Sequence, residues 1–236
     1  MSLTLTDLPT VVSQLTPHIS TDETLPVLHG IYLEATGTHL FACAPDRYPF
    51  ALARREATDT APWKAVLSRA DLVALRALFP TRRRPADLTL TFEAPTGDSD
   101  PDGHLSISDG HRALRVSANA PLASLFPKWR PLFANALAAE PQLTDEAHLN
   151  AAFLARWAKA PAERYEPLTV WSAGPGKPFL IAAGHGFLGL QMPVHREDKP
   201  SAPAADRQDR AALRTTWTDT LNSPAATVSE RHLKAA

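Results

Sequence analysis

The feature that most constrains the fold is a pattern that occurs three times: a helical segment followed by about three short strands. Apolar residues return every three or four positions within 3–15, 68–79 and 149–160, which predicts an amphipathic helix in each range. Short alternating stretches follow these helices at 30–36, 40–44, 50–55, 88–94, 104–108, 113–118, 168–173, 178–183 and 186–192. Helices followed by hairpin-connected strands predict an α+β fold built on antiparallel sheets.

The second helix has the clearest local signals. Ser68 is suited to the position before the first helical residue, and Asp71 follows three residues later, as in a capping box. Pro80 ends the helix, because proline cannot continue the backbone hydrogen-bond pattern. The sequence therefore predicts both ends of this helix, the start after Ser68 and the end before Pro80.

The composition indicates a water-soluble globular chain. Its 236 residues are enough for one large domain or two small ones. No apolar run approaches the roughly 20 residues of a membrane span, and the first residues lack the regions of a secretory signal. Cys43 is the single cysteine, so neither an internal disulfide nor a cysteine-rich zinc site is expected. We therefore expect a cytoplasmic protein with no membrane partner.

Positive charge is concentrated in one region, although the formal net charge of the chain is −1. Residues 64–84 contain six basic side chains against one acidic side chain, Asp71. Such a local excess is typical of a surface that contacts DNA phosphates. For the run from Arg82 to Arg84, a solvated basic turn after the helix is an equally open interpretation.

Catalytic and metal-binding motifs are absent from the sequence, with one loop to weigh. The chain has no Gly-x-Ser-x-Gly, His-Glu-x-x-His or Gly-x-Gly-x-x-Gly, so we expect no enzyme and no cofactor. Its nine histidines are scattered, so no metal site is expected. The loop from Asp98 to Asp109 has carboxylates at positions 1, 3, 5 and 12, as calcium loops do. Ordinary turn chemistry explains the same residues, so a calcium-binding or hydrolytic protein is only a third interpretation.

The stretch from Leu25 to Arg55 resembles the start of the middle domain of the bacterial DNA polymerase III beta sliding clamps. That family has Leu-x-Gly, then alternating apolar residues and Glu, and then Ala-Thr-Asp-x-(His/Tyr)-Arg-Leu. The matching residues here are Leu28, Gly30, Ile31, Leu33, Glu34, Ala44, Asp46, Tyr48 and Phe50. Pro45 and Pro49 depart from the motif, where the family has Thr and Arg, and they stiffen this corner of the chain.

Three further segments follow in the order of the same family. Residues 66–75 resemble the second helix of that domain, and residues 125–133 resemble its Phe-Pro-Asp-Tyr-Arg-Arg-Leu exit. Residues 178–196 resemble the terminal strands, which finish on Met-Pro-(Val/Met)-Arg. The resemblance implies a DNA-clamp-like α+β fold, in which each domain contains two half-domains of a helix plus an antiparallel sheet. The helices line a central DNA channel, and the sheets face outward.

The resemblance also implies how the chain is divided. Residues 1–130 would form one clamp-like domain of two half-units, and residues 131–197 a partial C-terminal domain of one half-unit. After that the composition shifts to Ala, Pro, Ser, Thr and mixed charge, which predicts a largely disordered tail at 198–236. A short helix around Leu213, Trp217 and Leu221 is the alternative for part of that tail.

In this family, partner proteins insert a short peptide of the type Gln-Leu-x-Leu-Phe into an apolar groove. Carried over residue by residue, the groove would consist of Leu28, Tyr48, Phe50, Pro127, Leu132, Leu190, Met192, Pro193 and Val194. Aromatic and proline side chains would form rigid walls, and methionine would adapt to the peptide. For Leu28, Leu132 and Leu190, an ordinary core position is an equally open interpretation.

The DNA-facing residues that the resemblance implies are basic side chains on or next to the second and third helices. They are Arg69, Arg76, Arg82, Arg83, Arg84, Arg156 and Lys159. Contacts of this kind are made to phosphates, without sequence preference, and weaken as salt rises. The first helix has no lysine or arginine, so it would add no positive charge to a channel.

We therefore expect a sliding-clamp-like processivity factor that tethers a DNA polymerase or repair protein to double-stranded DNA. A clamp loader is a further candidate partner, and a closed ring would require a homo-oligomer. The alternative is a clamp-derived adaptor or decoy, which captures the same peptides without encircling DNA.

Overall fold

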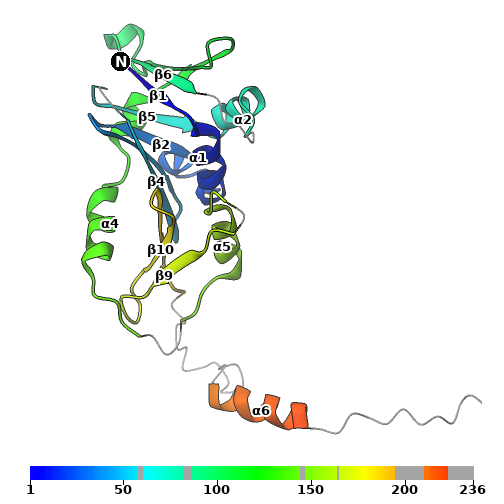
Figure 1. The fold of residues 1–236 in the computed structure, drawn as a ribbon. Helices are drawn as coiled ribbons and strands as arrows, with labels where there is room; N and C mark the ends of the chain where they lie inside the picture. Colours follow the sequence, from blue (N-terminus) through cyan, green and yellow to red (C-terminus); the bar gives the residue numbers. More distant parts are fainter. Residues whose placement is uncertain (58–60, 82–86, 144–146, 164, 195–209, 223–236) are drawn as a thin grey trace, which may run out of the picture. The chain divides into compact units, whose positions relative to one another are not determined.

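The chain contains two compact units, described here separately. The computed structural model describes residues 1–57, 61–81, 87–143, 147–163, 165–194 and 210–222 (Figure 1). Met1–His195 is the first compact unit and Arg196–Ala236 the second. The described residues of the second unit form helix α6 (Arg210–Asn222), which is the short helix weighed for the tail. The other residues of the expected tail lie outside the described part of the chain. No helix among the described residues is long and apolar enough to cross a membrane.

The first 117 residues contain two repeats with the same order of elements: a strand, a helix and a three-stranded meander. The first repeat consists of β1 (Ser2–Leu5), α1 (Leu8–Leu15), β2 (Gly30–Ala35), β3 (His39–Pro45) and β4 (Pro49–Glu56). Two 3-10 helices, η1 (Thr16–His18) and η2 (Pro26–Leu28), join α1 to β2. The second repeat consists of β5 (Trp63–Ser68), α2 (Arg69–Leu78), β6 (Leu88–Glu93), β7 (His104–Ser108) and β8 (Ala113–Ser117), with η3 (Gly97–Ser99) between β6 and β7.

These two repeats exchange their first strands. β1 leaves its own meander and pairs with β6, which gives a four-stranded sheet in the order β1-β6-β7-β8. In return, β5 pairs with β2. Every strand pair is antiparallel, as the sequence predicted. Helices α1 and α2 also contact each other. The exchanged strands and this helix contact together join the two repeats into one structure.

A third repeat extends the second sheet. It consists of α5 (Ala151–Arg156), η4 (Trp157–Lys159), β9 (Leu168–Trp171), β10 (Phe179–Ala183) and β11 (Phe187–Gln191). Because β11 pairs with β4, the sheet has seven strands in the order β5-β2-β3-β4-β11-β10-β9. One sheet thus contains strands from both sides of residue 130, and the division into domains there stays a prediction.

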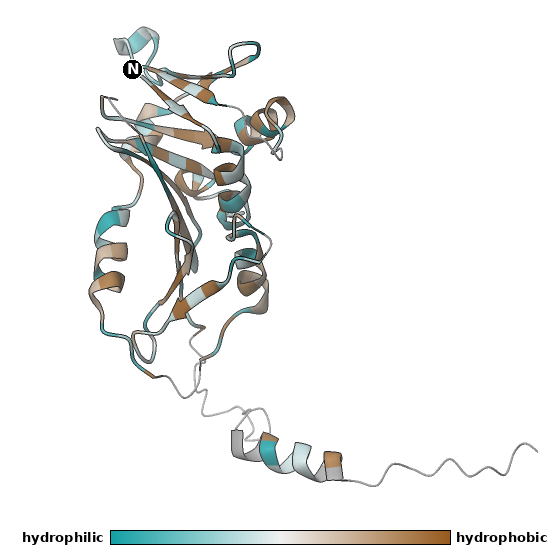
Figure 2. Cartoon of the chain, in the orientation of Figure 1, coloured by the Kyte–Doolittle hydropathy of each residue, from teal (hydrophilic) through white to brown (hydrophobic). Residues whose placement is uncertain are grey.

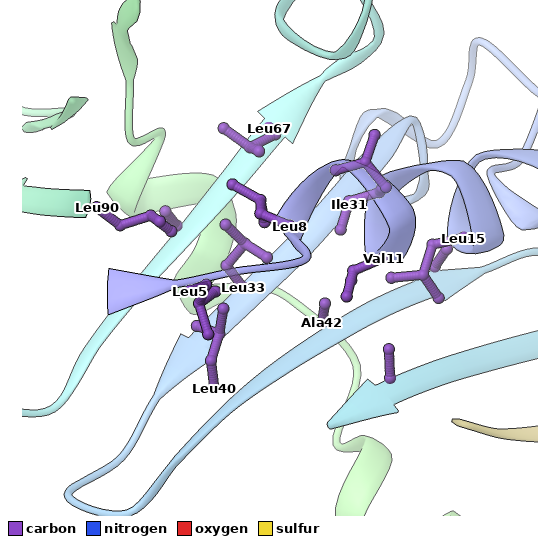
Figure 3. Packing of buried hydrophobic residues seen from close by; sticks show 14 of the residues in the cluster. Leu5, Leu8, Val11, Leu15, Ile31, Leu33, Leu40, Ala42, Leu67 and Leu90 are labelled. Atoms are coloured by element: carbon purple, nitrogen blue, oxygen red, sulfur yellow. The ribbon is translucent and has the colours of Figure 1, made fainter. Parts of the chain in front are cut away.

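Side chains alternate between the two faces along each strand, and both faces are covered over β2, β3 and β4, whereas the edge strand β9 is exposed along its whole length. On one face, Ile31 and Ala42 pack against Leu8, Val11 and Leu15 of α1 (Figure 3). The opposite face is covered by α3 (Ala120–Ser124) and α4 (Trp129–Ala138). Figure 1 shows α1, α2 and α5 on one side of the strands and α4 on the other. Apolar residues follow the same division, gathering on the strands and on the helix sides next to them (Figure 2).

The predicted helix 68–79 is confirmed together with its capping box. The Ser68 hydroxyl accepts a hydrogen bond from the Asp71 N–H, and the Asp71 carboxylate accepts one from the Ser68 N–H at 2.8 Å. The predicted helix at 149–160 is confirmed as α5 followed by η4. The helix expected over 3–15 is wrong in its first part, because residues 2–5 form β1 with Leu3 and Leu5 buried in alternation. The strand β5 and the helices α3 and α4 were not predicted.

Candidate functional site

An apolar groove of about 550 Å³ lies beside helix α4. Its walls come from α4, the β3–β4 corner, the end of β11 and the loop between β9 and β10. Seven of the nine residues expected in a groove line it: Leu28, Tyr48, Phe50, Pro127, Leu132, Leu190 and Met192. Residues 160 positions apart in the sequence are therefore brought to one surface. Pro193 and Val194 are not among the lining residues, and the Val194 N–H donates to the His148 carbonyl at 2.7 Å instead.

The floor and the rim of this groove have different exposure. Phe50 and Leu190 are direct cross-strand neighbours in β4 and β11 and are nearly buried, so they are at once core residues and floor. Leu132 on α4 keeps 48% of its surface exposed, which excludes an ordinary core position for it. Leu28 and Met192 are half-buried at the edges. The groove thus offers apolar surface to solvent above a packed base, which is the usual form of a peptide-binding site.

The corner between β3 and β4 is held by Asp46. Its backbone N–H donates to the Pro49 carbonyl at 2.8 Å, which closes the turn. Its carboxylate accepts hydrogen bonds from Arg156 Nη1 and from the Arg47 N–H, each at 2.7 Å. Burial alone would raise the pKa of the Asp46 carboxyl, but these hydrogen bonds outweigh burial and hold the pKa below its ordinary value. Arg47 makes a further ion pair with Asp22, so the corner is fixed to two other parts of the chain.

Tyr48 is the exposed member of the same corner. Its ring is 46% exposed and stacks on Phe153 of α5, with the ring centroids 5.2 Å apart. The Tyr48 carbonyl accepts a hydrogen bond from the Met192 N–H at 3.0 Å. Two residues on opposite sides of the rim are therefore joined through the backbone.

Part of the groove could not be read from the sequence. Helix α4 contributes Asn135, Ala136 and Ala139, and the β9–β10 loop contributes Ala173, Lys177 and Pro178. The available signal was the apolar spacing within "WRPLFANALA", which Pro131 obscured. Pro131 is the third residue of α4, and proline is tolerated in the first turn because the N–H groups there have no helical partner.

The expected DNA-facing residues that the structure describes divide into three groups. Arg76 and Lys159 line one open hollow of about 480 Å³ between α1, η1 and α2, together with Ser13, Thr16, Pro17, Pro80 and Thr81. Arg69 donates hydrogen bonds to the carbonyls of Ile19 and Ser20, at 3.2 and 2.7 Å. Arg156 is mostly buried and paired with Asp46, so its charge is compensated inside the protein. Arg82, Arg83 and Arg84 lie outside the described residues.

The loop from Asp98 to Asp109 is divided by a strand. Asp98, Asp100 and Asp102 lie in the β6–β7 connection, whereas Asp109 follows β7 and belongs to the next turn. Asp100 accepts from the Gly103 N–H at 3.2 Å, and Asp109 pairs with Arg112 at 2.6 Å. Four carboxylates that are separated in this way cannot surround one cation, so the residues serve two hairpin turns. Within the described residues, no group of three His, Cys, Asp or Glu side chains could hold a metal ion.

Comparisons with known proteins identify the fold. No protein-family model matches the chain, and no curated protein matches it. Among solved structures, the DNA polymerase III beta subunit of Thermotoga maritima matches with a TM-score of 0.62 and 14% identity, over 83% of this chain and 66% of that chain. The DNA polymerase sliding clamp of Bacillus subtilis matches with a TM-score of 0.57 and 14% identity, over 83% and 64%. The beta subunit from the DNA polymerase of Streptococcus pyogenes matches with a TM-score of 0.57 and 12% identity, over 93% and 73%.

This chain spans slightly less than two thirds of the first two of these proteins. The three-dimensional similarity nevertheless covers 83% of this chain. The chain itself has the helix-plus-sheet repeats expected from the sequence. The resemblance is therefore confirmed for the fold, and the chain has the sliding-clamp fold of the DNA polymerase III beta subunits.

Proposed function

We propose that this chain is a non-enzymatic scaffold that captures a peptide of a DNA polymerase or repair protein in its groove and tethers that partner to double-stranded DNA. The groove beside α4 is the observation that carries the proposal, because seven separately expected residues line one apolar hollow. The structures with the same fold are DNA polymerase subunits and sliding clamps, which supports this class of partner.

The groove suits an extended peptide with two or three apolar side chains. Its rim presents Tyr48 and Leu132, its floor is Phe50 and Leu190, and Met192 can change rotamer to fit an incoming side chain. A few such buried anchors commonly supply most of the affinity of a peptide. Two cations, Arg47 and Lys177, and one acid, Asp46, line the groove. Arg47 is paired with Asp22 and Asp46 with Arg156, so Lys177 is the cation that would face acidic residues flanking the apolar peptide.

DNA contact is supported by the hollow that Arg76 and Lys159 share. Both side chains belong to the side of the sheet that carries α1 and α2, away from α4. Two cations without a carboxylate between them form a site for a phosphate, and such contacts are independent of base sequence.

A second candidate function is an adaptor that binds the same peptides without encircling DNA. The charges on the helix side favour it, because Arg156 is neutralised by Asp46 and the Arg69 guanidinium is occupied by two carbonyls. Helix α1 contributes no charged side chain to that side. The positive charge left for phosphates is therefore smaller than the count of basic residues indicates.

Fluorescence polarisation of a labelled Gln-Leu-Ser-Leu-Phe peptide tests the groove. We expect saturable binding by the wild type and a loss of at least about tenfold in Met192→Glu, since a buried unpaired charge costs well over the 1.4 kcal/mol of a tenfold change. Val73→Glu on α2 is the matched control, because Val73 is exposed and far from the groove lining. No binding by the wild type, or equal affinities for both variants, would refute the peptide-binding proposal.

DNA binding across a range of salt concentrations separates the two candidates. For a chain that contacts phosphates, Lys159→Glu should lower the slope of log affinity against log salt by about 0.9, and Arg76→Glu should do the same. Lys128→Glu, which lies at the start of α4, should leave the slope unchanged. Peptide binding without any salt-dependent DNA binding would establish the adaptor and reject the tether.

A further inference from the structure

Each of the three meanders begins with a strand that has one edge facing away from the rest of its meander. Among the described residues, β9 is the one such strand that has no partner on that outer edge. In the first two repeats, the first strand of each meander has a partner on its outer side: β5 covers β2, and β1 covers β6. β9 occupies the same place in the third repeat, but it ends the seven-stranded sheet. The burial differs accordingly, because five of six residues are buried in β2 and none of four in β9.

The uncovered edge has a composition that is unusual for a strand left in water. Leu168, Val170 and Trp171 are 36%, 53% and 40% exposed, and β9 contains no charged residue and no proline (Figure 2). Exposed edge strands are normally protected by lysine, proline or a bulge, since their free N–H and C=O groups can pair with another chain. None of these protections lies within the four residues of β9, and Pro167 directly precedes the strand. Beyond its end, the Ser172 carbonyl accepts from the Gln142 N–H at 2.8 Å, so the free edge is limited to the four residues of the strand.

The side chains of β9 fall on two faces that are already defined. Val170 is opposite Ile181 in β10, and Ile181 is opposite Gly189 in β11, on which the Trp157 ring lies. Leu168 and Val170 are therefore on the side of the sheet that carries η4 and α5. On the helix next to η4, Ala151, Ala152, Leu154 and Ala155 are exposed, and α5 has no charged residue before Arg156.

We propose that β9 pairs with β9 of a second copy of this chain, antiparallel and about a two-fold axis. In the first two repeats the covering strand always comes from another repeat, and the exchange is reciprocal. Two third repeats are the pair that can satisfy the same need in each other. An axis at Thr169 places Leu168 of each copy opposite Val170 of the other, which makes two apolar cross-strand pairs with no like charges facing. On the same side of the sheet, the exposed small side chains of α5 add no charge that would oppose a second copy.

The mass of the full chain, measured by light scattering over a wide concentration range, tests this interface. We expect a dimer that dissociates on dilution, and a dissociation constant at least about tenfold higher in Val170→Lys, which corresponds to about 1.4 kcal/mol. Val73→Lys changes a valine on α2 that is even more exposed than Val170, and this variant should dimerise like the wild type. Circular dichroism and the melting temperature verify that both variants are folded. A monomer at every concentration, or a dimer that Val170→Lys does not weaken, would overturn the proposal.

Disulfide trapping gives an independent measurement of the same axis. Thr169→Cys should form an oxidised dimer that a reductant reverses, because a two-fold axis places this position opposite itself. Ala113→Cys on β8, the free edge of the other sheet, is the control and should stay monomeric. The native Cys43 is completely buried and adds no background. Cross-linking through Ala113→Cys but not through Thr169→Cys or Val170→Cys would assign the dimer to another edge. The proposal is independent of peptide binding, and Val170→Lys should keep the wild-type affinity for the peptide.

Discussion

Gly189 of β11 lies directly against the Trp157 ring within the third repeat, and Gly189→Ala should destabilise the protein. A Cβ at this position would lie 2.1 and 2.2 Å from two ring carbons of Trp157. The ring has no room to move, because Trp157 is 2% exposed, its Nε1 donates to Gln191 Oε1 at 3.0 Å, and His18 lies against it at 4.2 Å between ring centroids. The methyl group therefore has to displace a packed indole.

The expected cost follows from two opposing effects. Overpacking a core commonly costs about 1–3 kcal/mol, and the contacts here are short enough for the upper end of that range. Replacing glycine by alanine in an extended strand restricts the unfolded chain and returns about 0.4–1 kcal/mol. The net loss is about 2 kcal/mol, which lowers the melting temperature of a chain of this size by about 4–8 °C. Thermal unfolding followed by circular dichroism measures it.

Gly37→Ala is the matched control, because a Cβ there meets nothing within 4 Å. That variant should melt at or slightly above the wild-type temperature. If Gly189→Ala melts together with Gly37→Ala, the close contact with Trp157 does not limit this position and the reasoning fails. A second test is Trp157→Phe in the Gly189→Ala background: the smaller ring should cost less there than in the wild type, since residues in contact give non-additive effects.

Two further predictions concern His18 and Phe153. His18 is fully buried, and neither ring nitrogen has a hydrogen-bond partner among the described residues. Burial, and then the charge of Arg156, lower the pKa of His18 to about 3, whereas Asp46 has a smaller opposing effect. Since the unfolded chain binds this proton below about pH 6.5 and the folded chain does not, the free energy of unfolding should fall by about 2 kcal/mol between pH 7 and pH 5, and His18→Leu should remove that dependence in pH-resolved melting. Phe153→Ala should weaken peptide binding by about 2–12-fold, the equivalent of about 0.5–1.5 kcal/mol, because it removes the stack that positions Tyr48. Leu154→Ala is the control. Unchanged affinity in Phe153→Ala would show that the stack does not position Tyr48.

The sequence predicts the elements whose local signals are undisturbed, and the failures have physical causes. Ser68 and Asp71 fix the start of α2 because a capping box is a purely local structure. β1 was merged with α1 because the spacing of Leu5 and Leu8 is helical, although the spacing of Leu3 and Leu5 is that of a strand. β5 ends directly at α2, without the turn residues that usually separate a strand from a helix. The exchange of first strands between the repeats depends on long-range pairing, and the β1–β6 pairs are more than 80 residues apart, which no local pattern contains.

The groove was predicted through resemblance to a family, and its missing wall depends on tertiary structure. The lining residues of β4 and β11 follow from strand alternation once the strands are known, which is why Phe50 and Leu190 could be placed. The wall made by α4 was not placed, because Pro131 obscured the apolar spacing of its helix and because the face that the helix covers is set by tertiary packing. The same limit applies to Arg156. The exposed neighbours of Arg156 on its helix predict a surface cation. In the structure, Arg156 pairs with the carboxylate of Asp46, 110 residues earlier in the chain, and its side chain is mostly buried.

That pair explains why the chain places a charged, proline-flanked corner between two good strands. Asp46 anchors the corner to α5 through Arg156, and Tyr48 anchors it to the same helix through Phe153. The corner is thereby held between the two sides of the sheet: its contacts with α5 are on the helix side, and its apolar surface lines the groove beside α4. A flexible hairpin at this position would lose affinity each time a peptide had to order it. The two prolines and the two anchors make the corner rigid, which is the property that the proposed peptide-binding rim needs.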